Sequence, residues 1–369
     1  MTPRERMLAV FTRQRPDRIV WQPRIYYWYE VNKALGTIPA RYRGKSVEEV
    51  LDELNATPRT SQYYGACLRV RQEGDVKVTV REEGERVYYT YVTPRGELHE
   101  TLTRTDYMTL GGAGPSLHTE YLVKDVEDFK PLEYIIRNQS YEFDMEMYER
   151  IAKKIGDRAE SIIGVPHQPI QRLNVTYMGF AATVKALWKH PKEVDEFMQV
   201  MEEDDDKRFK VIEKSPIRIV NFGDNIHDDL VSPTMFKKYA LPYYRKRTAQ
   251  MHAAGKFCIS HWDGRFRRLL PFIKETGLDA LECVAPAPQG DFTSEELREA
   301  MGDMALMDGL PAVLFLPHVS YEELRRYAER TLELFSPRII LGIGDMLPPE
   351  GDIEKVRMIG EMVQDYTPP

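Results

Sequence analysis

A histidine and two carboxylates stand at places where apolar runs of the sequence end. The run Phe257–Ser260 is followed at once by His261 and Asp263, and the next apolar run ends at Glu282. A strand buried on both faces has no use for ionisable groups, because an unpaired charge is costly to bury. The carboxyl end of a strand at the rim of a barrel can use them. The pattern therefore predicts that these three side chains line a site.

The same pattern recurs throughout the carboxyl-terminal two thirds of the chain. The ionisable residues that end successive apolar runs are His167, Asp224, His261, Glu282, Asp308 and Asp345. In a parallel barrel such positions converge on one mouth, where crowding and burial shift pKa values. Any single one could instead cap the next helix, but six together predict an active site. The predicted catalytic residues are Asp224, His227, His261, Asp263, Asp308 and Asp345.

The spacing of these groups is also compatible with a metal ion. A catalytic zinc site uses about three protein ligands and leaves one position open. His261 and Glu282, from adjacent strand–helix units, could supply two ligands. Asp263 could be a third, or could orient the imidazole by a hydrogen bond. A metal-free His–Asp pair that works as acid or base is an equally good interpretation.

The aromatic stretch WQPRIYYWYE, Trp21–Glu30, allows two interpretations. It could be a strand followed by an aromatic core cluster. It could also form a wall on which a planar ligand stacks, with an arginine meeting the carboxylate of that ligand. The predicted substrate-binding residues are Arg24, Tyr26, Trp28 and His167.

The elements that must position these groups alternate between helices and short apolar runs from Phe143 onward. Repeated βα units with polar groups at strand ends predict an α/β fold, a parallel (β/α)8 TIM barrel. A doubly wound open sheet is the competing layout. The sequence has neither GxGxxG nor GxxxxGK[ST], so the usual nucleotide-binding loops are missing, which favours the barrel.

Before this alternation, a region at about 66–106 has strand spacing instead. The segments DVKVTV, RVYYTYVTP and GELHETLTR alternate apolar and polar residues and are separated by turn sequences. They predict an inserted antiparallel β meander of about three strands. We therefore expect residues 1–369 to form a single barrel domain that carries this insertion.

The composition restricts the class of protein. With 42% hydrophobic and 30% charged residues, the 369-residue chain suits a globular protein with a sizeable core. No apolar run approaches the ~18 residues that a membrane span needs. The charged opening argues against an export signal, and three cysteines form no disulfide framework. The net charge of −7 gives no attraction for nucleic acid. These features predict a cytoplasmic location.

Four segments resemble the uroporphyrinogen decarboxylase superfamily. They are PRERMLAVFTRQRPDRIVWQPR, VNFGDNIHDDLVSPTMFKKYALPYYRK, SHWDGRFRRLLPFIKETGLDALE and GIGDMLPPEGDIEKVRMIGEMV. The second resembles the central signature, a strand that ends in Asp before an SP-initiated helix. The resemblance extends from the first residues to the last, and it implies a (β/α)8 barrel.

The resemblance also implies a choice between branches of the superfamily. Decarboxylases of uroporphyrinogen have an arginine-rich loop near the amino terminus, and here the equivalent place retains only Arg24. Thiol-methylating, corrinoid-dependent members bind zinc through His-x-Cys, and here Asp263 replaces that cysteine after His261. The sequence is therefore most similar to methyltransferases that act on the methyl donor, including those of anaerobic aryl ether O-demethylation.

This branch implies transfer of a methyl group from a small methylated substrate, a methoxylated aromatic, to the cobalt of a corrinoid protein. The expected partner is that corrinoid protein, which carries cobalamin, and zinc is a second expected cofactor. A homodimer is left open. A decarboxylase of another carboxylated small molecule is the alternative enzyme, and a binding protein without catalysis is the third interpretation.

Overall fold

The computed structural model describes residues 1–112, 114 and 116–368. Contacts divide the chain into two compact units, and each is considered by itself. The first comprises Met1–Gly65, Glu146–Val165 and Ile217–Pro369. The second comprises Ala66–Met145 and Pro166–Pro216.

The first unit is built on a sheet of seven parallel strands. Their order across the sheet is β1 (Val20–Trp21), β13 (Ile339–Gly344), β12 (Ala305–Pro311), β11 (Ala280–Val284), β10 (Phe257–Trp262), β9 (Ile219–Ile226) and β8 (Ile162–Val165). From β8 to β13, sequence neighbours are also neighbours in the sheet, which is the arrangement of a βα barrel. The predicted α/β fold of the TIM-barrel type is confirmed.

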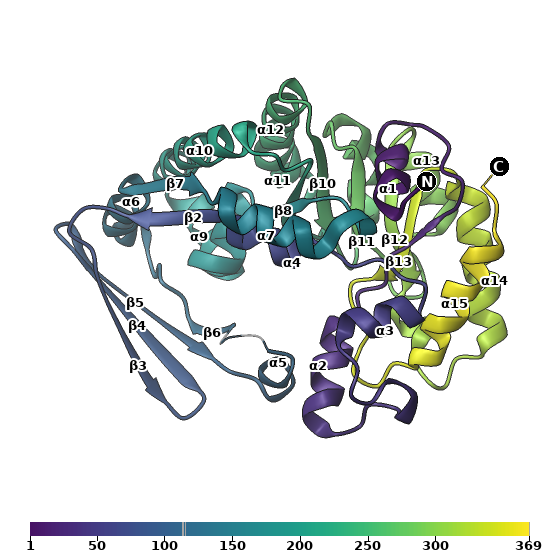
Figure 1. The fold of residues 1–369 in the computed structure, drawn as a ribbon. Coiled ribbons are helices and arrows are strands. Elements are labelled where there is room, and N and C mark those ends of the chain that lie inside the picture. Colours follow the sequence, from purple (N-terminus) through teal and green to yellow (C-terminus); the bar gives the residue numbers. More distant parts are fainter. Residues whose placement is uncertain (113, 115, 369) are drawn as a thin grey trace. The chain divides into compact units, whose positions relative to one another are not determined.

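Helices surround this sheet, and Figure 1 shows α14 and α15 outside the strands β12 and β13. The helices of the first unit are α1 (Pro3–Phe11), α2 (Tyr26–Leu35), α3 (Val47–Glu53), α4 (Ser61–Tyr64), α7 (Met145–Ile155), α11 (Pro233–Met235), α12 (Leu241–Ala253), α13 (Ser294–Met301), α14 (Tyr321–Phe335) and α15 (Ile353–Asp365). After β10 the connection is a 3-10 helix, η7 (Arg267–Glu275).

The barrel is not closed by a continuous ladder within the described residues, because its edge strands β1 and β8 do not pair. The segment 56–60 bonds to both edges instead. The Thr57 amide donates to the Trp21 carbonyl at 2.8 Å, and the Thr60 hydroxyl donates to the Glu160 carbonyl at 2.6 Å. Pro58 lacks an amide hydrogen, which prevents a full ladder. This segment therefore takes the place of the missing eighth strand.

An apolar core fills the amino-terminal end of the barrel. Met7, Val10 and Phe11 of α1 pack on Ile219 and Ile259, near the starts of β9 and β10. The helix is well terminated, because Thr2 and Glu5 form a capping box and Pro3 begins its first turn. With this end plugged by apolar side chains, polar groups gather at the opposite end.

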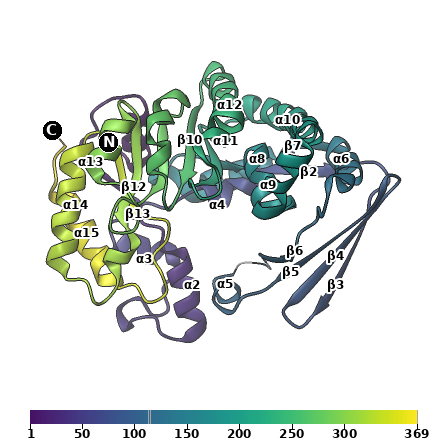
Figure 2. The same ribbon diagram turned by 180° about the vertical axis from the view of Figure 1, so that it is seen from behind.

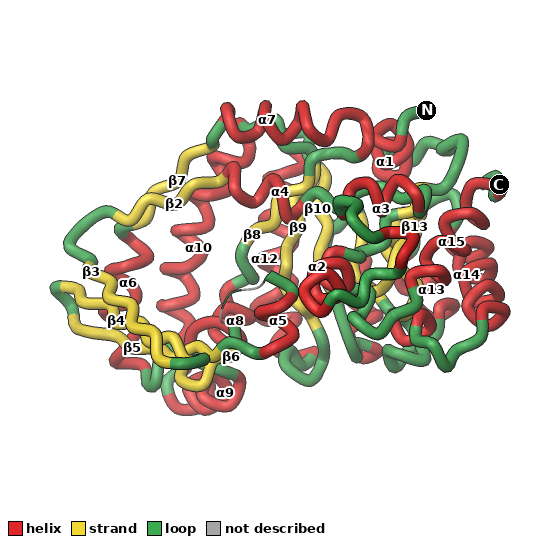
Figure 3. The backbone as a smooth tube through the Cα atoms, turned by 60° about the horizontal axis from the view of Figure 1, so that its bottom comes forward, coloured by secondary structure: helices red, strands yellow, loops and turns green. Residues whose placement is uncertain are grey.

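The second unit contains the predicted meander. Strands β3 (Lys77–Glu83), β4 (Arg86–Thr93), β5 (Gly96–Thr103) and β6 (Leu117–Glu120) form an antiparallel sheet, and β2 (Leu68–Gln72) pairs with β7 (Gln139–Phe143). Figure 3 shows β3, β4 and β5 running alongside one another. The antiparallel meander predicted near the amino terminus is confirmed.

The helices of the second unit are α5 (Asp106–Leu110), α6 (Phe129–Arg137), α8 (Pro169–Arg172), α9 (Phe180–Lys189) and α10 (Pro191–Lys214). Helix α9 ends at Lys189, and α10 begins with Pro191 in its first turn, where a proline is well tolerated. Throughout the described residues, each helix is either too short or too polar to cross a membrane.

Candidate active site

The register of two neighbouring strands brings the first site pair together. In the β10–β11 ladder His261 lies opposite Glu282. The imidazole Nδ1 lies 2.5 Å from Glu282 Oε2, and only 12% and 3% of the two side chains are exposed. A hydrogen bond at Nδ1 fixes the orientation of the ring and leaves Nε2 as the nitrogen available for chemistry.

A buried arginine connects this pair to the next strand. Arg59, from the segment 56–60, donates through Nη1 to Glu282 and through Nη2 to Asp308. Asp308 also accepts the Cys283 amide at 2.9 Å. Burial raises the pKa of Asp308, and Arg59 opposes that rise. The three side chains form a desolvated ion triad whose charges depend on one another.

A second arginine extends the cluster toward the last strand. Arg24 Nη1 lies 3.4 Å from Asp345 Oδ1 and 3.7 Å from Glu282 Oε1. The charged groups of the whole cluster are the arginines Arg24 and Arg59 and the carboxyl groups Asp263, Glu282, Asp308 and Asp345. The four carboxyl groups outnumber the two arginines, and they also outnumber the cations when His261 is protonated. This mouth therefore favours an added cation over an added anion.

The pKa values at the mouth move in opposite directions. Burial alone would lower the pKa of His261, but the Glu282 carboxylate raises it overall. Burial would raise the pKa of Glu282, but His261 and Arg59 hold it well below its usual range. Burial and Asp345 together raise the pKa of Asp263. Perturbed titration of this kind is common at functional sites.

Cys283 joins the cluster because its backbone is unusual. Strand alternation would turn its side chain away from that of Glu282. However, Cys283 has φ +72°, and the register is irregular between Leu281 and Val284. The ligand atoms of His261, Asp263 and Cys283 all lie within 4.8 Å of one another. One nitrogen, one oxygen and one sulfur donor at this separation suit a zinc ion with an open fourth position.

A cavity of about 320 Å³ opens at this mouth. It is lined by Arg24, Tyr26, Tyr27, Arg59, Ser61, Gln62, Gly164, Asn221, Gly223, His261, Glu282 and Met346. Two buried polar atoms, Asn221 Oδ1 and Arg59 Nε, have no hydrogen-bond partner among the described residues. Buried polar atoms are rarely left unpaired, so both are available to a bound molecule. The size is at the lower end for small-molecule sites.

Asp224, which we predicted to be catalytic, is not among the residues that line this cavity. It is fully buried and accepts a hydrogen bond from Tyr244 of α12 at 2.5 Å. Tyr244 in turn lies 3.0 Å from the Ser260 hydroxyl. On β9 it is Asn221 and Gly223, not Asp224, that line the cavity. The structure thus gives Asp224 contacts that position α12 against the strands.

The other predicted residues are distributed unevenly. His227 is half-buried, with Nδ1 3.9 Å from Asp229, and does not line the cavity. Trp28 is also outside the lining, since its indole is buried and donates to the Gly351 carbonyl at 3.0 Å. Tyr26 does line the cavity. His167 comes two residues after β8 and belongs to the second unit. Its carbonyl accepts a hydrogen bond from Arg172 at 2.6 Å.

The aromatic stretch is correspondingly not an extended strand. Strand β1 ends at Trp21, and α2 begins at Tyr26. Consecutive residues of a helix point in different directions, so Tyr26 and Tyr27 can face the cavity while Trp28 is buried. The stretch is thus a short strand followed by a helix, which buries Trp28 and Tyr29 and brings Tyr26 and Tyr27 to the cavity.

Sequence reasoning missed Arg59 and Cys283. A signal for Arg59 existed, because several carboxylates at strand ends need a buried counter-charge. No comparable signal marked Cys283, since its orientation depends on a positive φ angle that a non-glycine residue rarely adopts.

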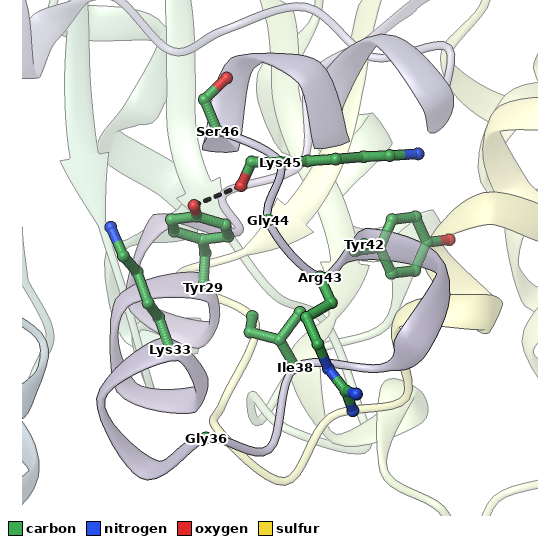
Figure 4. Close-up of a pocket in the computed structure, with 9 residues that line it drawn as sticks. All are labelled: Tyr29, Lys33, Gly36, Ile38, Tyr42, Arg43, Gly44, Lys45 and Ser46. Atoms are coloured by element: carbon green, nitrogen blue, oxygen red, sulfur yellow. Dashed lines mark hydrogen bonds between the residues drawn. The ribbon is translucent and has the colours of Figure 1, made fainter.

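A separate cavity of about 380 Å³ lies on α2 and the loop that follows it. Figure 4 shows Tyr29, whose hydroxyl donates to the Lys45 carbonyl, and the side chains of Lys33 and Arg43 that border the space. Its lining in the described structure includes no carboxylate, histidine or cysteine. The barrel mouth is therefore the better candidate for catalysis.

The fold and the polar mouth define a βα-barrel protein with its site at the carboxyl ends of the strands. Residues 106–366 match the model of the family described as uroporphyrinogen decarboxylase (URO-D). That match covers most of the chain, and the chain belongs to this family. Among proteins with curated descriptions, none matches the sequence significantly.

Two solved structures are similar to this chain at low sequence identity. A methyltransferase from Methanosarcina mazei is similar with a TM-score of 0.61 at 14% identity, over 99% of each chain. A B12-independent methionine synthase from Shewanella sp. W3-18-1, in complex with selenomethionine, matches with a TM-score of 0.43 at 10% identity, over 95% of each chain. The likeness to the Methanosarcina mazei protein concerns the fold alone.

Proposed function

We propose that this protein is a methyltransferase that moves a methyl group from a small methylated substrate, a methoxylated aromatic, to the cobalt of a corrinoid protein. The observation that carries the proposal is the donor trio His261, Asp263 and Cys283 at a mouth where carboxyl groups outnumber arginines. Both features favour a bound divalent cation. An aryl ether needs such help, because a phenolate leaves poorly unless its oxygen is protonated or polarised.

His261, Asp263 and Cys283 would hold zinc, and the bound ion would supply a Lewis acid for the ether oxygen. Glu282 accepts from His261 Nδ1, so in this proposal it orients a ligand and is not itself one. The buried Cys283 thiol has a pKa well above its ordinary value, through burial first and Asp345 second. A thiol in these surroundings needs a cation to become a thiolate.

The rest of the cavity would hold the substrate. Tyr26 and Tyr27 line one part of it and offer aromatic faces for a planar ring. Asn221 Oδ1 can accept a hydrogen bond from a ring hydroxyl, since it has no other described partner. Arg24 is the cavity-lining cation that remains 23% exposed. It can stabilise the negative charge that develops on the oxygen when the methyl carbon transfers to cobalt(I).

Decarboxylation of a carboxylated small molecule is the second candidate, because Arg24 and Arg59 both line the cavity. Arg59 is already paired with the buried Glu282 and Asp308, so the partly exposed Arg24 is the one lining arginine left to meet a substrate carboxylate. A polycarboxylate would add charge to a mouth that already has more carboxylates than cations. The charge balance therefore favours methyl transfer.

The test incubates the purified protein with cob(I)alamin and a panel of methoxyarenes and follows the cobalamin absorption spectrum. We expect methyl-cobalt formation with at least one member, and we expect removal of the metal by a chelator to abolish it. No methyl transfer across the panel, together with CO₂ release from a carboxylated compound, would replace this function with the decarboxylase.

A further inference from the structure

Helix α9 of the second unit exposes an apolar stripe. Phe180, Val184 and Trp188 are 40%, 42% and 80% exposed. They are spaced four residues apart, so they lie on one face of the helix. The other tryptophans, Trp21, Trp28 and Trp262, are all at most 3% exposed. A tryptophan so exposed, in line with two further apolar side chains, is typical of an interaction surface.

The helix that presents this stripe is held firmly within its unit. Its opposite face buries Thr183 and Ala186, and the Thr183 hydroxyl donates to the Gly179 carbonyl at 2.9 Å. Gly179 has φ +80°, and a side chain there would collide with the ring of Tyr121. Figure 2 shows α9 alongside α8 and α10. The stripe is therefore preorganised, which lowers the entropy cost of binding.

Two lysines border the stripe on one side. At 100° per residue, Lys185 and Lys189 follow Trp188 around the helix surface. Both are exposed, and neither forms an ion pair with any described residue. Paired lysines elsewhere in this unit, such as Lys207 with Asp204, show that partners are common here. The edge of the stripe thus offers unpaired positive charge to an acidic partner.

The area of the stripe distinguishes between types of partner. From the exposed fractions, its three side chains present roughly 300–400 Å², since a whole aromatic side chain buries ~150–250 Å². A stable dimer needs ~800 Å² from each partner. An interface of this size suits a protein that binds, reacts and leaves. A second copy of this chain would need a much larger contact.

We propose that the Phe180–Val184–Trp188 stripe is the docking surface for the corrinoid protein, and this inference rests on the function proposed above. A methyl-transfer partner must dissociate after every turnover, which matches the small area. The partner surface would be an apolar pocket bordered by carboxylates that meet Lys185 and Lys189.

The experiment compares two methyl acceptors, free cob(I)alamin and the purified corrinoid protein of the same organism. Free cob(I)alamin needs no docking surface. We expect Trp188→Ala to raise the KM for the corrinoid protein by roughly 30-fold, the effect of losing a hot-spot residue. The rate with free cob(I)alamin should stay within about twofold of wild type, because Trp188 is an exposed residue that does not line the cavity.

Matched controls separate this effect from general damage. Val184→Ala should weaken use of the corrinoid protein, and Val80→Ala, at a 52% exposed position of β3, should not. Lys185→Glu should also weaken use of the corrinoid protein. Lys210→Glu, on the exposed face of α10, should leave it unchanged. Added salt should reduce the difference between Lys185→Glu and wild type, because the lysine effect is electrostatic.

A direct binding measurement keeps docking distinct from catalysis. Trp188 is the exposed tryptophan, so its emission should shift to the blue when the corrinoid protein is added, even if no methyl donor is accepted. Absence of that shift, or equal corrinoid-protein kinetics in Trp188→Ala and wild type, would overturn the docking surface. A dimer in sedimentation equilibrium that Trp188→Glu dissociates would overturn it in favour of self-association. Failure of wild type with both acceptors would instead count against the proposed function alone.

Discussion

Strand β10 has a histidine–carboxylate pair near each of its ends, and the two pairs differ in burial and in the backbone around them. At the carboxyl end His261 meets Glu282 at 2.5 Å, with Asp263 and Cys283 close by. Before the amino end His252 meets Asp279 at 2.8 Å, and Cys258 is their neighbour. In each cluster the histidine, aspartate and cysteine donors lie within 4.8 Å of one another.

Burial and backbone strain distinguish the two ends. The His252 side chain is 41% exposed, against 12% for His261. Of the six non-glycine residues described with positive φ angles, Asn225, Cys283, Asp308 and Asp345 lie within or directly after the barrel strands β9, β11, β12 and β13, and the other two are Arg13 and Asn55. None of His252, Cys258 and Asp279 is among the residues described with positive φ. Strained backbone concentrates at functional sites, so the comparison teaches that surroundings, not donor types, identify the site.

The largest effect should come from removing each histidine in turn. His261→Ala should lower kcat by about 10²–10⁴-fold, the usual contribution of a group that assists at the leaving oxygen. His252→Ala should leave kcat within about twofold, because it lies at the opposite end of the barrel unit. The measurement is methyl transfer to cob(I)alamin, with circular dichroism as the check on folding. Equal losses in the two variants would refute the distinction between the ends.

Stability should respond most strongly to the ion triad at the mouth. Arg59→Met leaves Glu282 and Asp308 buried without their shared cation, which should cost about 3–5 kcal/mol in the free energy of unfolding. The matched change at an exposed pair, Arg245→Met opposite Glu275, should cost less than ~1 kcal/mol. Urea unfolding of both variants measures the difference. A small effect at Arg59 would mean that the two carboxyl groups accept protons readily when unpaired.

Metal content should separate the two cysteines. Cys283→Ser should weaken zinc binding by at least roughly 10–100-fold, the loss seen when even an outer partner of a ligand is removed. Cys258→Ser, a change to an equally buried thiol in the neighbouring strand, should leave zinc stoichiometry unchanged. Zinc per chain after dialysis against a graded chelator provides the comparison. Substitution with cobalt(II) should add a sulfur charge-transfer band that only Cys283→Ser abolishes.

The sequence predicts the fold better than it predicts the site. The alternation of helices and apolar runs is enough to indicate the parallel barrel and the meander, because burial on a sheet or helix leaves a periodic record. The same alternation also predicts His261, Asp263 and Glu282 as site residues, because ionisable groups there end the apolar runs. The wall of the barrel formed by 56–60 left no such record, because Pro58 disrupts strand spacing.

Two features of the site leave no pattern in the sequence: the direction of the Asp224 side chain and the position of Cys283. The direction of the Asp224 side chain depends on the phase of β9, which a short strand that is buried on both faces does not reveal. The presence of Cys283 in the cluster depends on a single positive φ angle. Strand ends can therefore be located from sequence, but the atoms that meet there are set by tertiary packing.

The smallest expected effect concerns the exposed pair. The hydrogen bond from His252 to Asp279 raises the pKa of His252, and partial burial opposes that rise. A histidine with a raised folded-state pKa contributes stability that is fully present below its unfolded pKa of about 6.5 and is lost as pH rises through the folded value. At about pH 5.5 we therefore expect the wild-type protein to have a larger free energy of unfolding than His252→Gln. At about pH 8.5 we expect the two free energies to be equal. Because the histidine side chain is partly exposed to solvent, the difference should stay below ~1 kcal/mol.

Urea unfolding midpoints across this pH range measure the difference. The control is His190→Gln, since the carboxylate nearest to His190 is 3.8 Å away. A difference that grew with pH would show that the aspartate does not stabilise the protonated ring, and the contrast between the two ends of β10 would then rest on burial alone.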